Sequence, residues 1–216
     1  MISDFTQQQL DSLTIAPERP LVICDVDEVV VHFTRAFESY LARDNLYLDP
    51  ASFALSGNIK RIGSEELIAQ DRMLDIIDQF FVDRTEHLEP IDGAIESLLD
   101  LSANASVVML TNLPHHARDK RIRNLQNLGL AFPCVTNSGP KGPAISHLAA
   151  QTSGPVVFID DSPGFIASCR DHAAHVHMIH FLHDERFAKH LEPFDFVSLT
   201  ANSWTVARPH IAGLLA

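Results

Sequence analysis

Short apolar runs alternate with amphipathic stretches along most of the chain. We interpret the runs as strands of a parallel sheet, because strands that are buried on both faces are continuously apolar. The first run, Leu-Val-Ile-Cys, is the clearest of them. The expected strands cover residues 21–26, 107–110, 132–135, 156–159, 176–181 and, more weakly, 196–199.

Helical patterns fill the intervals between these strands. A short polar helix is expected first, at residues 4–13, and Gly129 is expected to end the helix at 117–128. The other helices are expected at residues 94–101, 143–150, 163–169, 185–191 and 204–215. Strands that alternate with helices favour right-handed crossovers, so the sequence predicts an α/β fold with a doubly wound parallel sheet.

Residues 34–90 follow a different pattern. A helix is expected at 35–42, and Ser64 with two following glutamates is expected to open a longer amphipathic helix. No strand-like alternation is apparent in this region. We therefore predict an all-helical insertion at 34–90, which divides one core into residues 1–33 and 91–216.

Composition narrows the function. The formal net charge is -12, with 28 acidic and 16 basic residues, which disfavours nonspecific binding to a nucleic acid polymer or to an anionic membrane. Residues 1–20 lack a signal-peptide pattern, and no apolar stretch reaches the roughly 20 residues that cross a bilayer. The cysteines Cys24, Cys134 and Cys169 are scattered, as in reduced cytoplasmic proteins.

Polar residues directly follow three of the predicted strands, and a lysine begins a nearby helix. Because the carboxyl ends of parallel strands meet at one edge of a sheet, we expect these side chains to lie together. Carboxylates gathered there would repel one another unless a cation lay between them. The residues are Asp25, Asp27, Thr111, Asn112, Lys141, Asp160 and Asp161.

These residue types suit phosphoryl transfer through a covalent aspartyl phosphate. One carboxylate can attack phosphorus, and a second, two residues on, can protonate the leaving oxygen and later activate water. Further carboxylates can hold Mg²⁺, which prefers hard oxygen ligands. A hydroxyl and an ammonium can bind the phosphoryl oxygens, where negative charge accumulates.

The order of these motifs resembles the four-motif signature of the haloacid dehalogenase-like (HAD) superfamily. The resemblance runs from about residue 21 to 181 and rests on Asp25-Val-Asp27, Thr111-Asn112, Lys141 and Asp160-Asp161. It implies a Rossmann-like core, a small helical cap at 34–90, and Mg²⁺.

The resemblance also implies a role for each residue. Asp25 would be the nucleophile, and Asp27 the acid/base with its backbone carbonyl on the metal. Asp160, together with Asp25 and Asp161, would complete the metal site. The phosphoryl group would be bound by Thr111, Asn112 and Lys141.

Two features bear on the reaction. The dehalogenases of the family lack the second carboxylate, so Asp27 indicates a phosphatase or a phosphomutase. Many relatives have glycine after that carboxylate, whereas this chain has Glu28, as in the deoxyribonucleotidase-like branch. We predict a Mg²⁺-dependent phosphatase of a small phosphorylated metabolite, with a nucleotidase among the options. A phosphomutase, a receiver-like signalling module and a non-catalytic phosphate-binding protein are the alternatives.

Several residues outside the motifs are candidates for lesser roles. The possible substrate contacts are Phe33, directly before the insertion, and Arg35, Lys60 and Arg61 within it. The histidines His175, His177, His180 and His183 could bind a metal, although no cysteine pair accompanies them, and His115 and His116 are expected mainly at the surface. Cys24 and Trp204 are expected to pack in the core. The sequence leaves the oligomeric state open.

Overall fold

The computed structural model describes residues 2–216 and contains a six-stranded sheet in the order β5-β4-β1-β6-β7-β8. All five neighbouring pairs are parallel. The chain winds outward from β1 in both directions, as the doubly wound prediction requires. The strands are β1 (Leu21–Cys24), β4 (Ser106–Asn112), β5 (Cys134–Asn137), β6 (Val156–Asp160), β7 (His177–Phe181) and β8 (Leu199–Ala201).

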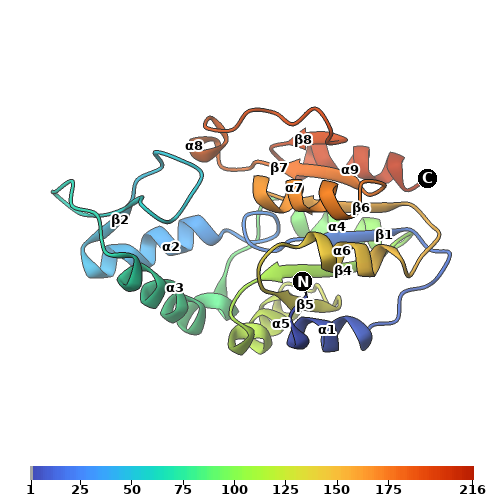
Figure 1. Ribbon diagram of the computed structural model, residues 1–216, viewed down its shortest axis with the longest axis horizontal. Helices are drawn as coiled ribbons and strands as arrows, with labels where there is room; N and C mark the ends of the chain where they lie inside the picture. Colours follow the sequence, from blue (N-terminus) through green and yellow to red (C-terminus); the bar gives the residue numbers. More distant parts are fainter. Residues whose placement is uncertain (1) are drawn as a thin grey trace.

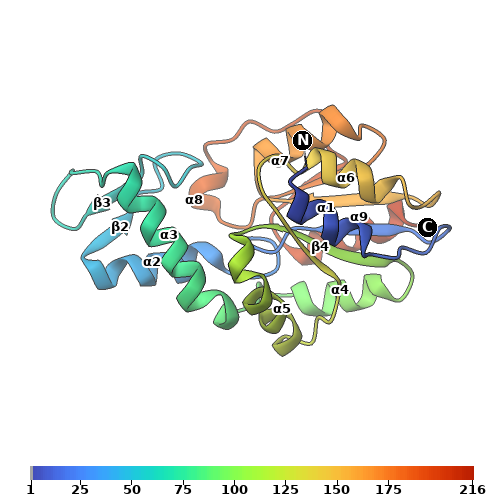
Figure 2. The same cartoon turned by 60° about the horizontal axis from the view of Figure 1, so that its bottom comes forward.

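Helices cover both faces of this sheet (Figures 1 and 2). Alternate side chains of β1 enter two apolar clusters, with Val22 and Cys24 on one face and Leu21 and Ile23 on the other. The first face is covered by α4 (Ala94–Ser102), α5 (Arg118–Asn127) and α9 (Trp204–Leu214). The second face is covered by α1 (Asp4–Asp11), α6 (Gly142–Ala149) and α7 (Pro163–His172). No helix in residues 2–216 is long and apolar enough to cross a membrane.

The segment between β1 and α4 forms a second lobe beside the sheet (Figure 1, left). It holds α2 (Phe33–Leu41), the 3-10 turn η1 (Ala42–Asp44), β2 (Leu46–Leu48), β3 (Ile59–Arg61), α3 (Gln70–Arg84) and the 3-10 turn η2 (Thr85–His87). The expectation of an all-helical segment is therefore wrong, because β2 and β3 pair as an antiparallel ribbon. Strands of three residues are too short for a period of two to be recognised in the sequence.

The long helix of this lobe begins at Gln70, six residues after the predicted start at Ser64. Ser64 caps a turn and not a helix, since its hydroxyl accepts a hydrogen bond from the backbone N–H of Glu66. Lys60 on β3 pairs with Glu65 at 2.6 Å and holds the same turn. The acidic residues that suggested a helix start therefore stabilise the end of the ribbon.

The remaining predicted elements are confirmed, with ends that shift by a few residues. Gly129 has φ +81°, the left-handed conformation expected after the last turn of α5. The last strand lies at Leu199–Ala201 and not at 196–199, because Phe194 and Phe196 pack their rings together at 4.8 Å between centroids before the strand begins. Between β7 and β8 the chain also forms the short helix α8 (Glu185–Ala188).

Candidate active site

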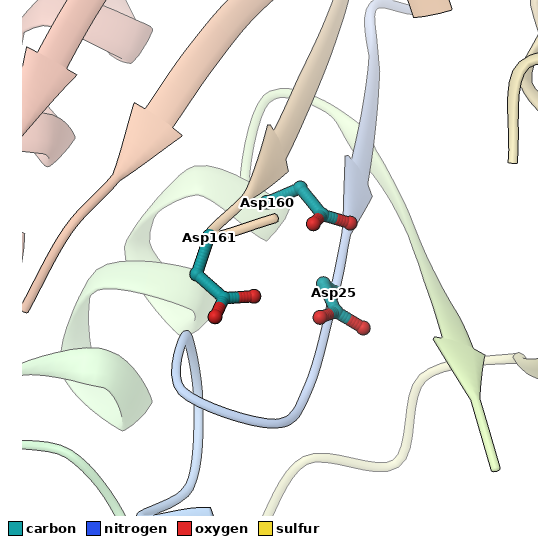
Figure 3. Close-up of side chains that lie close together, drawn as sticks. All are labelled: Asp25, Asp160 and Asp161. Carbon is teal, nitrogen blue, oxygen red and sulfur yellow. The ribbon is translucent and has the colours of Figure 1, made fainter. Parts of the chain in front are cut away.

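Three carboxylates meet where β1 and β6 end. Asp25 follows β1 directly, Asp160 is the last residue of β6, and the two strands are neighbours, with Cys24 opposite Ile159. Figure 3 shows the side chains of Asp25, Asp160 and Asp161 turned toward one another. Each contributes an oxygen atom, and these oxygens all lie within 4.8 Å of one another. The sheet thus brings together the residues that the sequence placed at its carboxyl edge.

A buried lysine lies against this cluster. Lys141, which precedes α6, is fully buried, and its Nζ lies 2.7 Å from Asp25 Oδ1 and 2.6 Å from Asp160 Oδ2. Burial alone would lower the pKa of Lys141, but the charges of Asp160 and Asp25 outweigh it and raise the pKa. The ammonium is therefore charged, and it holds the predicted nucleophile against the neighbouring strand.

The charges of the cluster fit a divalent cation. Burial raises the pKa of Asp160 to about 7 even with Lys141 beside it, and burial together with Asp160 raises the pKa of Asp161. Three carboxylates and one ammonium leave two negative charges in a site whose ligand atoms are hard oxygens. Mg²⁺ supplies the opposite charge and prefers such ligands. The residues therefore fit the metal that the sequence predicted.

The carboxylate of Asp27 lies apart from this cluster and has a partner of its own. Arg121 Nη2 lies 2.5 Å from Asp27 Oδ1, and the guanidinium is fully buried. Burial raises the pKa of Asp27, and the guanidinium opposes that shift only in part. Arg121 was absent from the predicted site. The sequence signal is its position on α5, one turn before the buried Leu125, where a core-facing side chain is expected.

The two residues at the end of β4 lie in different surroundings. Thr111 is fully buried, and its Oγ1 has no hydrogen-bond partner within residues 2–216. Asn112 donates to the carbonyl of Gly139 at 2.8 Å and accepts from Asn137 at 3.0 Å. Asn112 therefore ties β4 to the end of β5 and to the loop before Lys141.

Glu28 occupies an unusual backbone position. Its φ is +58°, in the left-handed region where glycine is the ordinary residue. The carboxylate accepts a hydrogen bond from the backbone N–H of Thr34 at 2.6 Å, in the first turn of α2. Burial raises the pKa of Glu28 to about 7. Glu28 thus joins the turn after β1 to the second lobe.

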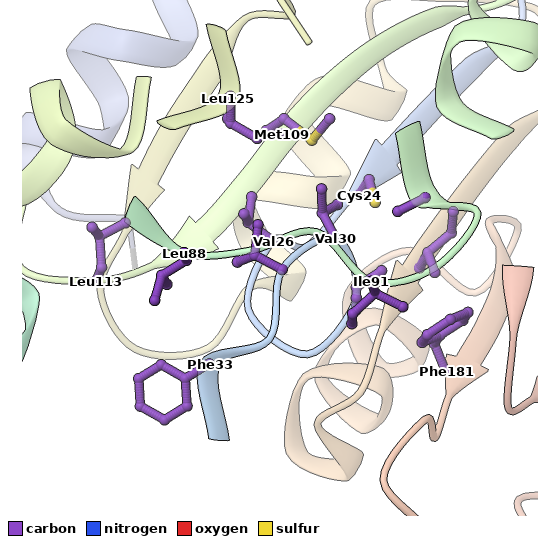
Figure 4. Packing of buried hydrophobic residues seen from close by; sticks show 14 of the residues in the cluster. Cys24, Val26, Val30, Phe33, Leu88, Ile91, Met109, Leu113, Leu125 and Phe181 are labelled. Carbon is purple, nitrogen blue, oxygen red and sulfur yellow. The ribbon is translucent and has the colours of Figure 1, made fainter. Parts of the chain in front are cut away.

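Apolar packing supports the same turn. Val26 and Val30 lie among Leu88, Ile91 and Met109 in the cluster of Figure 4. The apolar cluster continues from the sheet into the second lobe, since it also includes the buried α2 and α3 side chains. The turn after Asp25 is therefore held in place by close-packed apolar side chains of the core.

A cavity of about 350 Å³ opens above the carboxylates, between the sheet and the second lobe. Asp25, Asp27, Glu28, Asn112 and Asp161 contribute its polar residues near the sheet. Thr111 and Lys141 lie below its surface. Four residues after β7 also line the cavity: Leu182, His183, Asp184 and Phe187. His183 was predicted only as a possible metal ligand, and the other three were not predicted, although β7 ends at the same edge and the same rule would have found them.

Of the four predicted substrate contacts, only Phe33 lines the cavity. Arg35 pairs with Glu89 at the surface. Lys60 lies between Asp49 and Glu65, and Arg61 lies 3.7 Å from Glu66. These three cations are thus paired with carboxylates outside the cavity.

The C-terminal histidines do not form a metal site among residues 2–216, where the carboxylate cluster is the one candidate group. His183 lines the cavity, with Nε2 4.0 Å from Glu28. His180 is buried and donates from Nε2 to the backbone carbonyl of Asp161 at 2.9 Å. His177 lies 3.5 Å from Ser198, and His175 is exposed. His180 therefore supports the backbone of Asp161 beside the carboxylate cluster.

The remaining residues named from the sequence lie where they were predicted, in the core or near the surface. Cys24 and Trp204 are fully buried, and the indole N–H of Trp204 donates to the carbonyl of Val29 at 2.8 Å. His116 lies at the surface, 3.5 Å from Asp78. His115 is half-buried against Thr136 at 2.8 Å, away from the cavity.

Comparisons with known proteins show which fold this is. No family model and no curated protein matches the sequence. Among solved structures, an HAD family hydrolase from Deinococcus radiodurans with bound phosphate and sodium has a TM-score of 0.61 and 21% identity, covering 93% of this chain and 99% of that one.

Two further structures have TM-scores of 0.54 and 14% identity. The putative HAD-hydrolase YfnB from Bacillus subtilis, bound to magnesium, covers 91% of this chain and 99% of its own. The defluorinating L-2-haloacid dehalogenase Rha0230 covers 94% of this chain and 100% of its own. The chain therefore has the fold of haloacid dehalogenase-like hydrolases, a group that includes more than one reaction.

Proposed function

We propose that this protein is a Mg²⁺-dependent phosphatase that hydrolyses a small phosphate monoester through an aspartyl phosphate on Asp25. One observation carries the proposal. Lys141 is fixed between Asp25 and Asp160. A second carboxylate, Asp27, lies two residues after Asp25 and is held separately by Arg121. Nucleophile and acid/base therefore have different environments, as two-step phosphoryl transfer requires.

In the first step an oxygen of Asp25 attacks phosphorus, and the bond from phosphorus to the ester oxygen breaks. Asp27 gives its proton to that oxygen, a role that its raised pKa supports. The ammonium of Lys141 and the hydroxyl of Thr111, which has no other partner within residues 2–216, are the donors for the phosphoryl oxygens. In the second step Asp27 takes a proton from water, which attacks the acyl phosphate and releases inorganic phosphate.

The metal would be held by Asp25, Asp160 and Asp161. When bound, Mg²⁺ supplies positive charge to the phosphoryl oxygens and to the crowded carboxylates. YfnB, which shares this fold, contains magnesium. The buried, unpaired cysteines support a reducing compartment, so we also propose a cytoplasmic location.

Dehalogenation is the main rival, because Rha0230 has the same fold. The carboxylate of Asp27 favours the phosphatase. A dehalogenase releases halide, which leaves without a proton, so it does not need a proton donor at this position, whereas the raised pKa of Asp27 suits one. Arg121 also fixes Asp27 beside the cavity, where a leaving oxygen would lie.

The test measures phosphate release from an aryl phosphate and halide release from an L-2-haloacid, each with and without Mg²⁺. We expect the protein to release phosphate and no halide, and to do so only with Mg²⁺. The rate of phosphate release should fall by at least about a thousandfold in Asp25→Asn. Halide release without phosphate release would refute the proposal. Transfer of the phosphoryl group to an alcohol in place of water would indicate a phosphomutase.

A further inference from the structure

We infer that the group esterified to the phosphate in the substrate is uncharged and apolar, and about the size of one aromatic ring. This inference rests on the proposed function and specifies its substrate class. It comes from the cavity wall beyond the carboxylates, which is made by both lobes.

Phenylalanine is the residue type that occurs most often in that wall. Phenylalanines come from α2, the 49–58 loop, α3, α7, β7 and α8, so they surround the cavity from six segments of the chain. A wall of this kind gains free energy by taking apolar surface out of water, and a flat ring can stack on it or meet it edge to face. The residues are Phe33, Phe53, Phe81, Phe165, Phe181 and Phe187.

The wall is fixed where the two lobes meet. The rings of Phe53 and Phe187 lie edge to face, with centroids 6.3 Å apart and planes at 84°. Beside them Arg186 Nη1 lies 2.7 Å from Glu38 Oε1 on α2, and His190 Nε2 donates to the carbonyl of Pro50 at 2.8 Å. The α8 segment therefore holds the second lobe over the cavity.

The loop that carries Phe53 is also internally fixed. The buried side-chain amide of Asn58 donates to the carbonyls of Ser52 and Ala54 at 3.2 and 2.8 Å and to the Ser52 hydroxyl at 2.7 Å. Phe53 is thus presented by a hydrogen-bonded loop and does not depend on the ligand for its position. Such a preformed apolar surface costs little free energy to organise on binding.

The polar groups of the wall are poorly suited to a sugar. Glu28 is engaged by Thr34, Asn112 by Gly139 and Asn137, and Asp184 by Arg186. His183 is the one imidazole in the wall and could serve a single hydroxyl. The other hydroxyls of a sugar would lose their water in this cavity without gaining equivalent partners, which is unfavourable for each of them.

A second anionic group is equally disfavoured. No lysine or arginine within residues 2–216 lines the cavity, and the nearby Arg186 is already paired with Glu38 and Asp184. The volume of about 350 Å³ is also near the lower end of ligand pockets, which run from about 300 to 1,000 Å³. A monophosphate that carries one ring or a short apolar chain suits both the lack of cations in the lining and the small volume of the cavity.

The first experiment compares kcat/KM with Mg²⁺ for 2-phenylethyl phosphate, glycerol 3-phosphate, glucose 6-phosphate and thymidine 5′-monophosphate. All four release primary alcohols, so their intrinsic reactivities differ little. We expect 2-phenylethyl phosphate to exceed the other three on the order of tenfold or more. A preference for the sugar phosphate or the nucleotide overturns the inference and leaves the phosphatase proposal intact.

Two variants test whether the phenylalanines of the cavity wall cause the preference for 2-phenylethyl phosphate. Phe53→Ala should reduce the ratio of kcat/KM for 2-phenylethyl phosphate over glycerol 3-phosphate by about fivefold or more, because a wall residue is lost. The control is Leu74→Ala, which changes an exposed apolar residue of α3 that does not line the cavity and should keep the ratio of the wild type. An unchanged ratio in Phe53→Ala contradicts the inference.

A binding measurement separates this inference from the reaction. Calorimetry compares 3-phenylpropylphosphonate with methylphosphonate, neither of which can be hydrolysed at a phosphate ester. We expect the phenyl compound to bind at least about tenfold more tightly. Tighter binding together with no turnover of any phosphate ester would retain the apolar site and refute the phosphatase. Equal binding of the two phosphonates would refute the apolar site.

Discussion

Arg121 Nη2 lies 2.5 Å from Asp27 Oδ1, an ion pair that joins α5 to the turn after β1 across 94 positions of sequence. The guanidinium is fully buried, and the side chain of Asp27 is 18% exposed. The pair links the core helix behind β4 to the residue proposed as acid/base, so it contributes both to stability and to the position of the proton donor.

Arg121→Met should destabilise the protein by about 3 kcal/mol, because a buried ion pair that loses one partner leaves an uncompensated charge. Chemical denaturation measures the change. The control is Arg123→Met on the same helix, whose exposed pair with Glu86 should contribute less than about 1 kcal/mol. A loss in Arg121→Met no larger than in this control would show that the buried pair does not hold the turn.

Glu28 should make the metal-free protein less stable as the pH rises. Its folded pKa of about 7 exceeds the ordinary value of 4.5, so the folded state binds the proton more tightly than the unfolded state does. The stabilisation is complete below pH 4.5 and is lost as the pH rises through 7, by about 3 kcal/mol in total.

Glu28→Gln isolates this effect, because the amide oxygen can still accept the hydrogen bond from Thr34. Unfolding free energies measured with EDTA from pH 4 to 8 should fall less steeply in Glu28→Gln than in the wild type. The variant should be the more stable protein at pH 8. Parallel curves for the two proteins would mean that Glu28 does not titrate in this range.

Mg²⁺ should stabilise the folded protein through the carboxylate cluster. At a concentration 100 times the Kd, binding to the folded state alone adds about 2.7 kcal/mol, a rise in Tm of roughly 5–10 °C for a chain of this size. Asp160→Asn should abolish most of the rise. Asp171→Asn, at an exposed carboxylate paired with Arg170, is the control and should respond as the wild type does. A full rise in Asp160→Asn would exclude this metal site.

The sheet and the carboxylates gathered at its edge could be predicted because their signals are local. Asp25 and Asp160 each end a continuous apolar run, and the geometry of parallel strands then brings them together. Lys141 has no such run directly before it, and its assignment rested on its place at the start of a helix after the third strand and on the need for a cation near the phosphoryl oxygens. In the structure it is the residue that contacts both carboxylates.

The features that sequence analysis missed depend on tertiary contacts. Arg121 is one of several basic residues on a polar helix, and only its burial opposite Asp27 distinguishes it. Phe53 and Phe187 lie 134 positions apart and meet only because α8 packs on the second lobe. The pairing of β2 with β3 depends on three residues in each strand, which periodicity cannot detect. Lys60 and Arg61 looked available for a substrate only because their acidic partners could not be seen in the sequence.

The most direct test of the central claim is to trap the covalent intermediate on Asp25. The protein is mixed with a ³²P-labelled phosphate monoester and Mg²⁺, quenched in acid, reduced with borohydride and mapped by peptide mass spectrometry. The acyl phosphate of an aspartate is reduced to homoserine, so we predict homoserine at position 25, no modification at Asp27, and no label in Asp25→Asn. Label at another residue, or phosphate release by Asp25→Asn at the wild-type rate, would contradict the account.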